Sequence, residues 1–197
     1  MKDGNFSFRN IPEGTDTFMN SITLEQRLRN VIRDIPDFPQ PGILFRDITP
    51  VLQDASLCRE IVDEICSEFQ DEKIDGVVGV ESRGFLFGMM IASKLNIPFI
   101  PVRKKGKLPF KTIAYEYKLE YGSAIVEMHT DAFQPGSRFL IHDDLLATGG
   151  TASAAAELIR MQGGHVSGFA FLIALDFLGG KNILKQYSER ITSLVTY

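Results

Sequence analysis

The segment Ala147–Thr151, called here the glycine turn, places two glycines and two threonines between an apolar run and a helix-favouring stretch. Where a strand ends in such a turn, the first backbone N–H groups of the helix are unpaired, and together with the helix dipole they attract anions. Gly149 and Gly150 allow positive φ angles and close approach of a ligand, while the hydroxyls of Thr148 and Thr151 can donate hydrogen bonds. The glycine turn is therefore predicted to bind phosphate.

Two adjacent carboxylates, Asp143 and Asp144, called here the acid pair, lie just upstream of the glycine turn. They would repel a phosphate that touched them, and they better suit the hydroxyls of a sugar or a metal ion held by those hydroxyls. A phosphate beside vicinal hydroxyls describes a ribose 5-phosphate. The plainer alternative is a strand-to-helix turn with solvated acids. Neither a Walker A lysine nor a G-x-G-x-x-G pattern accompanies the glycines.

A second turn that suits an anion follows another apolar run. Residues 76–80 are predicted to form a buried strand, and Glu81-Ser-Arg-Gly84 then leads into a helix. The guanidinium of Arg83 has the fork geometry that matches phosphate oxygens, although taken alone it is better explained as the partner of Glu81 in a structural ion pair. Ligands of parallel sheets bind beyond the carboxyl ends of the strands, so both turns are expected to face one ligand.

The remaining pattern is that of an α/β protein. Thr23 and Gln26 form a capping box for a helix whose apolar stripe reaches Ile35, after which Pro36 enforces an extended loop. Asp54 can cap a second helix. Strands that alternate with helices predict a mainly parallel sheet with right-handed crossovers. The expected strands are 76–80, 97–102, 138–143 and 166–175, with a helix at 85–95 and a β-ribbon formed by 112–117 and 123–128.

Length and composition fit one domain in a reducing compartment. The chain has 197 residues, 44% of them hydrophobic, and its net charge of −4 argues against nucleic acid as a partner. Residues 1–22 are polar and are expected to extend a domain at 23–197. Cys58 and Cys66 are expected to be buried thiols. Because no apolar run suggests a membrane span or a signal peptide, we expect a cytoplasmic protein without a membrane partner.

The sequence Asp143-Asp-Leu-Leu-Ala-Thr-Gly-Gly-Thr151 resembles the phosphoribosyl-pyrophosphate signature of type I phosphoribosyltransferases, in the wording of the adenine phosphoribosyltransferase branch. Similar motifs follow the family's order from Phe38 to Leu175. The resemblance implies a mainly parallel sheet flanked by helices, with a small hood and a flexible catalytic loop. It also implies a homodimer that converts adenine and phosphoribosyl pyrophosphate to AMP and pyrophosphate in purine salvage. Mg²⁺ is then expected to be held through substrate and water near the acid pair, rather than directly by the protein.

The basic residues take their expected roles from the same resemblance. Glu81-Ser-Arg-Gly-Phe-Leu-Phe-Gly88 resembles the family's pyrophosphate loop, which implies a cis peptide between its first two residues and a catalytic pyrophosphate contact for Arg83. Residues 101–109 resemble the stretch that leads into the flexible hood. By that resemblance Arg103 and Lys107 contact pyrophosphate, Arg103 from the neighbouring subunit. The other lysines nearby are expected to be solvated: Lys104, Lys105 and Lys111.

Leu119-Glu-Tyr-Gly122 lies between the two runs of the β-ribbon and matches the branch's catalytic-loop motif. A glutamate in a loop is usually only solvated. It is the resemblance that implies an acid–base role at the purine for Glu120, with Tyr121 as its neighbour. Closure of such a loop would exclude water from an easily hydrolysed intermediate.

Residues 38–50, called here the base loop, resemble the adenine-binding segment of the family. A proline-stiffened loop with apolar residues can offer an aromatic wall to a flat heterocycle, although it can equally be a packed surface loop. The resemblance implies that Phe45 stacks on adenine, that the backbone of Arg46 recognises the edge of the base, and that Leu175 contacts it. His142 replaces a usual aliphatic residue and is expected to be packed and neutral.

Two alternatives stay open at this point. One is a phosphoribosyltransferase for another purine base, against which the base loop and the catalytic-loop motif argue. The other is a purine-sensing regulator on the same fold. Such regulators carry an added DNA-binding domain, whereas only a short polar stretch without a basic helix precedes Thr23 in this sequence.

Overall fold

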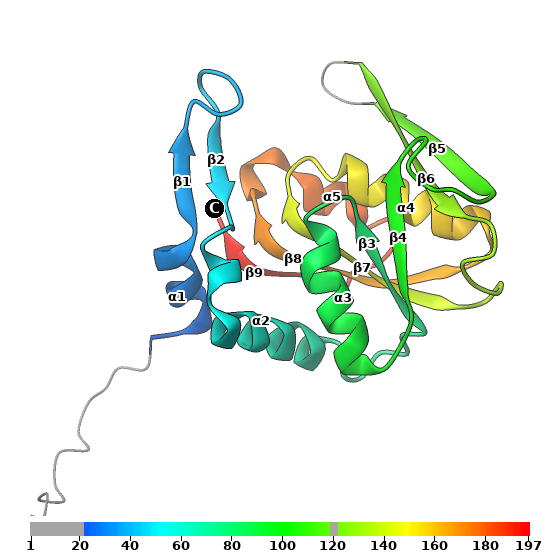
Figure 1. The fold of residues 1–197 in the computed structure, drawn as a ribbon, viewed down its shortest axis with the longest axis horizontal. Coiled ribbons are helices and arrows are strands. Elements are labelled where there is room, and N and C mark those ends of the chain that lie inside the picture. Colours follow the sequence, from blue (N-terminus) through cyan, green and yellow to red (C-terminus); the bar gives the residue numbers. More distant parts are fainter. Residues whose placement is uncertain (1–21, 119–121) are drawn as a thin grey trace, which may run out of the picture.

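The structure, a computed structural model, describes residues 22–118 and 122–197. Its centre is a seven-stranded sheet with helices on both faces (Figure 1). Neighbouring strands are parallel except that β6 pairs antiparallel with both β5 and β4. The strands stand in the order β5 (Thr112–Lys118), β6 (Ser123–His129), β4 (Phe99–Lys104), β3 (Gly76–Val80), β7 (Arg138–Leu146), β8 (His165–Ala174) and β9 (Ile191–Thr196).

The helices form two layers, and each layer shares a core with one face of the sheet. Alternate residues of β7 point to opposite faces, so that Leu140 belongs to the core beneath the first layer and Ile141 to the core beneath the second. The first layer contains α1 (Leu24–Val31), α2 (Ala55–Glu68) and α3 (Gly84–Leu95); the second contains α4 (Gly150–Met161) and α5 (Gly180–Leu184). Short 3-10 helices are η1 (Val51–Gln53) and η2 (Asp176–Leu178).

Several predicted elements are confirmed with their local causes. Thr23 and Gln26 form the capping box of α1. Oδ1 of Asp54 accepts hydrogen bonds from the backbone N–H groups of Ser56 and Leu57, both at 2.9 Å, which starts α2. The buried strand at 76–80 and the β-ribbon, now β5 and β6, are present as well. The expected mainly parallel sheet flanked by helices is thus the fold that is observed.

The prediction that the first helix extends to Ile35 is wrong. Helix α1 ends at Val31, and the chain continues as β1 (Arg33–Pro36), which pairs antiparallel with β2 (Leu44–Asp47). Ile35 lies opposite Phe45 in this hairpin. The spacing of Ile35 fits a helical stripe, but pairing with the base loop gives the backbone a partner that sequence periodicity cannot reveal.

Two other corrections concern the end of the sheet. Strand β7 does not stop at Asp143 but continues to Leu146, which pairs with Ala174 of β8. Asp144, which follows the predicted strand 138–143, therefore lies within β7 together with Asp143. The elements α5 and β9 were not predicted, although β9 carries the β-branched residues that are typical of strands.

The structure also tests the predictions for the two cysteines and for the peptide between Glu81 and Ser82. Cys58 and Cys66 are free and buried, as expected. The peptide between Glu81 and Ser82 is cis, as the resemblance implied, and so is that between Phe38 and Pro39. Within the described residues, no helix is both long enough and apolar enough to cross a membrane.

Candidate active site

The predicted site lies at one edge of the sheet, where β3, β7 and β8 end. The β1–β2 hairpin and the β5–β6 hairpin project from this edge on either side (Figure 1). The base loop contributes β2 of the first hairpin, and the predicted β-ribbon, called here the hood, is the second. Ligands of parallel sheets bind beyond the carboxyl ends of the strands, so the two hairpins flank the expected binding region.

The glycine turn lies between β7 and α4, where it lines a cavity of about 210 Å³. Gly149 has a φ of +82°, and a Cβ at this position would come within 2.8 Å of the carbonyl oxygen of Gly180. Only glycine fits there. The first turn of α4 carries no acidic residue and no side-chain cap. Its N-terminal N–H groups are therefore left for a ligand, an arrangement that suits phosphate.

The acid pair lines the same cavity from the last residues of β7. Asp144 is 3% exposed, and its backbone N–H donates a hydrogen bond to Oδ1 of Asp143 at 2.9 Å. Burial, followed by the negative charge of Asp144, raises the pKa of Asp143 well above its usual value. Burial also raises the pKa of Asp144, and the charge of Arg83 opposes that shift. Hydroxyl donors or a cation would favour the charged form of both groups.

Arg83 connects the acid pair with the base loop. It caps the start of α3, and its Nε lies 3.0 Å from Oδ2 of Asp144. Its guanidinium carbon lies 5.0 Å from the ring centroid of Phe45. The ion pair with Asp144 replaces the structural pair with Glu81 that the sequence had left open. One cation thus joins residues predicted to contact pyrophosphate, ribose and base.

The base loop presents an aromatic surface and a backbone edge. The rings of Phe45 and Phe38 pack edge to face, with centroids 5.1 Å apart. The side chain of Arg46 forms an ion pair with Asp34 and lies over the ring of Tyr197, 3.6 Å from its centroid. The guanidinium of Arg46 is thus engaged within the protein, and the contact between its backbone and the base stays a prediction.

Two further residues flank the end of β7. The N–H of Leu175, just beyond β8, donates to the carbonyl of Leu146 at 2.8 Å, so this predicted adenine contact lies next to the strand that carries the acid pair. His142 is fully buried, with its ring 6.4 Å from that of Phe87. Burial lowers the pKa of His142 to about 4, opposed in part by the backbone of Ala170. The ring is packed and neutral, as expected.

Arg103 and Lys107 are connected to the pyrophosphate loop through Glu81. Oε2 of Glu81 accepts hydrogen bonds from Nε of Arg103 at 3.2 Å and from the N–H of Lys104 at 3.0 Å. Burial raises the pKa of Glu81, but these hydrogen bonds and the charges of Arg103 and Lys107 outweigh it, so the pKa is lowered overall. Nη1 of Arg103 also donates to the carbonyl of Lys107 at 3.1 Å. These contacts hold Arg103 within its own chain, and its action from a neighbouring subunit stays a prediction.

The β5–β6 hairpin reaches the glycine turn through Tyr117, near the end of β5. The hydroxyl of Tyr117 lies 3.2 Å from Oγ1 of Thr151, and a Cβ on Gly150 would lie 3.5 Å from the tyrosine ring. Glu120, the predicted acid–base residue, and its neighbour Tyr121 lie outside the described residues. The strand that leads toward them thus contacts the predicted phosphate site.

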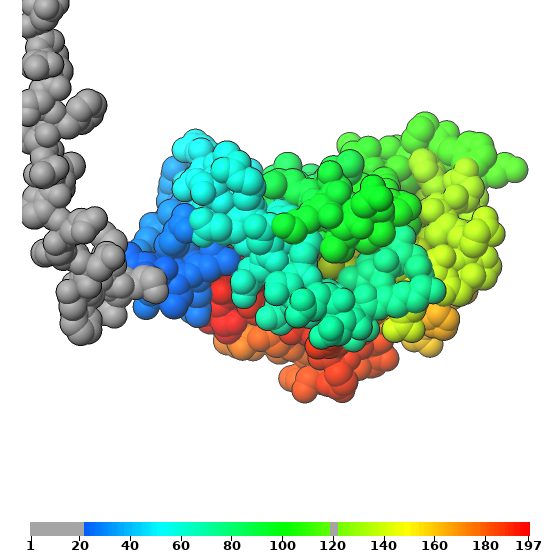
Figure 2. Space-filling model, turned by 90° about the horizontal axis from the view of Figure 1, so that it is seen from below, coloured from blue at the N-terminus to red at the C-terminus, as the bar shows by residue number. Residues whose placement is uncertain are grey.

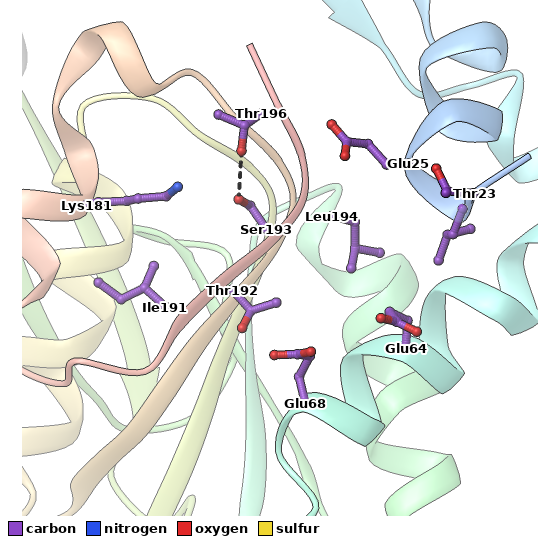
Figure 3. Close-up of a pocket in the computed structure, with 11 residues that line it drawn as sticks. Thr23, Glu25, Glu64, Glu68, Lys181, Ile191, Thr192, Ser193, Leu194 and Thr196 are labelled. Atoms are coloured by element: carbon purple, nitrogen blue, oxygen red, sulfur yellow. Dashed lines mark hydrogen bonds between the residues drawn. The ribbon is translucent and has the colours of Figure 1, made fainter.

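A larger cavity, of about 570 Å³, lies between α1, α2 and β9 and shares no lining residue with the glycine turn (Figure 3). Glu25, Glu64 and Glu68 contribute its carboxylates and Lys181 contributes one cation. The three glutamates are exposed to solvent. Their charge would repel a phosphate, so this cavity does not provide the anion site that the sequence predicts.

Sequence reasoning missed two residues that the structure brings to this region, Tyr117 and Glu127. In β5, alternation places Ile113, Tyr115 and Tyr117 on one face, and all three pack against the core. That period-two pattern could have indicated Tyr117. Glu127 is buried in β6 and accepts a hydrogen bond from the N–H of Lys107 in the turn after β4, and the sequence carries no signal that distinguishes it from a solvated glutamate.

Comparison with known proteins gives a consistent result. Residues 48–182 match the family model described as the phosphoribosyl transferase domain. The adenine phosphoribosyltransferase of Cytophaga hutchinsonii is 53% identical over 174 residues, which are 88% of this chain and 96% of the relative. The adenine phosphoribosyltransferase of Myxococcus xanthus is 50% identical over 187 residues, or 95% of this chain and 98% of the relative.

Solved structures agree with the sequence matches. The adenine phosphoribosyltransferase of Thermoanaerobacter pseudethanolicus has a TM-score of 0.85 at 47% identity, covering 89% of this chain and 100% of that one. The Saccharomyces cerevisiae enzyme, complexed with D-2,5-dideoxy-2,5-imino-altritol 1,6-bisphosphate and adenine, has a TM-score of 0.81 at 38% identity, covering 87% and 98%. The chain has the type I phosphoribosyltransferase fold, and it belongs to the adenine phosphoribosyltransferase family.

Proposed function

We propose that this enzyme transfers the 5-phosphoribosyl group of phosphoribosyl pyrophosphate to adenine, giving AMP and pyrophosphate in purine salvage. The observation that carries the proposal is the cavity in which the glycine turn, the acid pair and Arg83 meet, with Phe45 close to Arg83. A phosphate, a sugar and a flat base can be bound side by side in such a site. The names of the relatives and the adenine bound to the yeast enzyme support the same reaction.

The phosphoribosyl half of the donor is assigned to the end of β7 and the glycine turn. The N–H groups at the start of α4 and the hydroxyls of Thr148 and Thr151 would hold the 5-phosphate. The carboxylates of the acid pair would accept hydrogen bonds from the ribose hydroxyls. The oxygen-rich acid pair also suits Mg²⁺, which keeps several waters, and a bound ion would offset the charge of pyrophosphate. We expect substrate oxygens and water to be its main ligands.

The chemical step would rely on positioning and charge. When the bond between C1′ and the pyrophosphate oxygen breaks, positive charge develops on the ribose and negative charge on the leaving group. The cations of Arg83, Arg103 and Lys107 would stabilise pyrophosphate as it leaves. A purine nitrogen then forms the new bond to C1′, and Glu120 is assigned the ring proton that this nitrogen loses. Tyr121, beside Glu120, belongs to the same proposed loop.

Adenine would be held between the base loop and the end of β8. We assign stacking to the ring of Phe45, recognition of the edge of the base to the backbone of Arg46, and an apolar contact to Leu175. The engagement of the Arg46 side chain with Asp34 supports a backbone role, because it fixes the strand that would face the base.

A homodimer is part of the proposal. Leu86, Met89 and Met90 follow the i, i+3, i+4 spacing along α3, and they are 43%, 55% and 37% exposed. Met89 and Met90 adjoin α2 across a hollow of about 520 Å³ whose lining includes Arg59 and Asp63. Figure 2 shows the teal and green segments that include α2 and α3 lying side by side on this face. An apolar patch rimmed by charges is typical of a protein interface, and we assign it to a second copy of the chain.

The domain is assigned to residues 23–197, with 1–22 as an extension, because the capping box at Thr23 begins the first helix. We also assign the enzyme to the cytoplasm. The support is its two buried free thiols, Cys58 and Cys66, which suit a reducing compartment.

Product analysis tests the proposed function. The purified protein is incubated with Mg²⁺, phosphoribosyl pyrophosphate and either adenine, hypoxanthine or guanine. We expect AMP from adenine and little product from the other two bases. Preferred conversion of hypoxanthine or guanine would instead indicate a phosphoribosyltransferase for another purine. Absence of any nucleotide, together with salt-sensitive binding to DNA, would favour a purine-sensing regulator.

A further inference from the structure

A buried carboxylate holds the turn that carries Lys107. Glu127, in β6, is 5% exposed. Its Oε1 accepts hydrogen bonds from the backbone N–H groups of Lys107 and Leu108, both at 3.0 Å, and its Oε2 accepts one from the hydroxyl of Thr112 at 3.3 Å. No salt bridge involves Glu127 within the described residues. A buried charge of this kind needs its hydrogen bonds, because desolvation is otherwise unfavourable.

The turn above Glu127 has little other support. Lys105, Gly106 and Lys107 are exposed, and a Cβ added at Gly106 would meet nothing within 4 Å. The N–H of Lys105 donates to the carbonyl of Ile125 in β6 at 3.0 Å. Apolar packing therefore does not fix the rest of the turn. The backbone at Lys107 is held by hydrogen bonds on two sides: Glu127 accepts from the N–H groups of Lys107 and Leu108, and the carbonyl of Lys107 accepts from Arg103.

The hydrogen bonds continue from this turn to the pyrophosphate loop. The peptide of Lys107 donates to Glu127 on one side and accepts from Arg103 on the other, and Arg103 in turn donates to Glu81. Arg103 and Glu127 are register partners in β4 and β6, so the sheet fixes one end of this chain of contacts. Two carboxylates, Glu81 and Glu127, thus bracket the two cations predicted to contact pyrophosphate.

We propose that Glu127 is a positioning residue for pyrophosphate recognition. It sets the backbone of the turn so that Lys107, and through it Arg103, present their charges to the leaving group. Both oxygens of Glu127 are occupied by protein donors, so it acts through these residues and does not contact substrate. The inference rests on the proposed function, in which Arg103 and Lys107 bind pyrophosphate.

Substitutions that differ in hydrogen bonding test this role. Glu127→Leu removes both acceptors, whereas Glu127→Gln keeps an amide oxygen that can accept from both N–H groups. The reverse reaction separates the substrates, because KM for pyrophosphate and KM for AMP are measured in the same assay. We expect Glu127→Leu to raise KM for pyrophosphate about tenfold or more, as lost hydrogen bonds of this kind do. We expect KM for AMP to change less than about twofold, since the AMP contacts are elsewhere.

Two comparisons separate positioning from general damage. Glu127→Gln should keep KM for pyrophosphate within about threefold of the wild-type value. Glu116→Leu is the matched control, because Glu116 is an exposed glutamate of the same hairpin that bonds to Ser123 and not to the turn. It should leave KM for pyrophosphate unchanged. If Glu127→Leu does not fold, Glu127→Asp replaces it, since the shorter carboxylate cannot reach both N–H groups and should show the same selective rise.

Three results would overturn the inference. An unchanged KM for pyrophosphate in folded Glu127→Leu or Glu127→Asp would show that the turn does not need this carboxylate. A parallel rise in KM for AMP would indicate general damage to the fold. A Glu127→Gln variant as impaired as Glu127→Leu would show that charge, and not the acceptor geometry, matters. Wild-type protein that forms no AMP from adenine would instead overturn the proposed function, so the two failures are distinct.

Discussion

His142 precedes the acid pair and is the most deeply buried titratable group near the site. Within the described residues neither ring nitrogen makes a hydrogen bond of ordinary geometry, and the backbone of Ala170 is the polar group that acts on the ring. Burying a polar group without a good hydrogen bond costs free energy of folding. His142 is nevertheless placed directly before the carboxylates that are assigned to the substrate. Its ring packs against α3, where a Cβ at Gly88 would lie at the ordinary contact distance of 3.6 Å from it.

The low pKa of His142 predicts a loss of stability in acid. In the unfolded chain the pKa is near 6.5, and in the folded chain it is about 4. As the pH falls from 6.5 toward 4, only the unfolded state binds the proton, so the free energy of unfolding decreases, by about 2 kcal/mol at pH 5. His142→Leu lacks this effect. Urea unfolding at pH 7.5 and pH 5 should show the variant gaining about 2 kcal/mol relative to wild type at the lower pH.

The acid pair does not obscure this comparison. Raised pKa values of Asp143 and Asp144 act in the opposite direction, because the folded state then binds protons before the unfolded state does. Both carboxylates are present in wild type and in His142→Leu, so their effect largely cancels in the difference. A stability difference that is the same at both pH values would contradict the buried, neutral state of His142.

Individual residues could be predicted from the sequence where the chemistry is contiguous. The glycine turn follows the acid pair directly, so its residue types alone indicate phosphate beside a sugar. The partner of Arg83 could not be predicted, because Asp144 is distant in sequence and Glu81 is adjacent. Folding brings Asp144 within 3.0 Å of Arg83, and Glu81 instead accepts from Arg103. The sequence alone does not show which distant carboxylate will pair with an arginine.

At the scale of elements, local signals determined helix starts better than strand ends. Asp54 caps α2 as predicted because a cap depends on a few neighbouring residues. Strand β1 was not predicted, because its pairing with β2, which belongs to the base loop, outweighs the helical spacing of Ile35. Strand β7 continues beyond Asp143 because β8 supplies partners up to Leu146. Long-range pairing therefore sets the features that sequence periodicity did not predict.

Two glycines with positive φ, Gly149 in the turn between β7 and α4 and Gly136 in the loop before β7, provide a matched pair of substitutions. Gly149 and Gly136 both have positive φ, +82° and +88°, but only at Gly149 would a Cβ collide with backbone, at 2.8 Å from Gly180. Gly136→Ala should lose about 1 kcal/mol of stability from the backbone conformation alone and keep its kinetics. Gly149→Ala should lose more stability and raise KM for phosphoribosyl pyrophosphate at least tenfold, because the start of α4 must shift. Urea unfolding and steady-state kinetics measure both effects.

Equal effects of Gly149→Ala and Gly136→Ala on stability and on KM for phosphoribosyl pyrophosphate would contradict this prediction. If Gly149→Ala kept the wild-type KM for phosphoribosyl pyrophosphate, the close contact with Gly180 would have no bearing on substrate binding. The assignment of phosphate to the glycine turn would then be wrong.

At the scale of the whole molecule, the exposed face of α3 determines the expected assembly. The chain carries a net charge of −4, so association between copies must overcome a modest repulsion by burying apolar surface. The stripe of Leu86, Met89 and Met90 provides such surface on the face opposite to α4 and α5. The dimer proposal depends on this stripe.

Replacing one methionine in this stripe should separate the subunits. Met89→Asp places a charge in the proposed interface, and Met161→Asp is a matched control, because Met161 is equally exposed, at 55%, on α4. Sedimentation should give a dimer for wild type and Met161→Asp and a monomer for Met89→Asp. A monomeric wild type, or a Met89→Asp variant that stays dimeric, would show that α3 does not form the interface.

The central claim is that the acid pair binds the ribose of phosphoribosyl pyrophosphate. Asp143→Asn and Asp144→Asn keep the shape of the side chains but remove charge-assisted hydrogen bonds, each worth about 1.5–3 kcal/mol. The most direct measurement is steady-state kinetics of both variants with each substrate varied in turn. We predict that kcat/KM for phosphoribosyl pyrophosphate falls roughly 10- to 100-fold, while KM for adenine changes by less than about threefold. Equal losses for both substrates, or none for phosphoribosyl pyrophosphate, would contradict the claim.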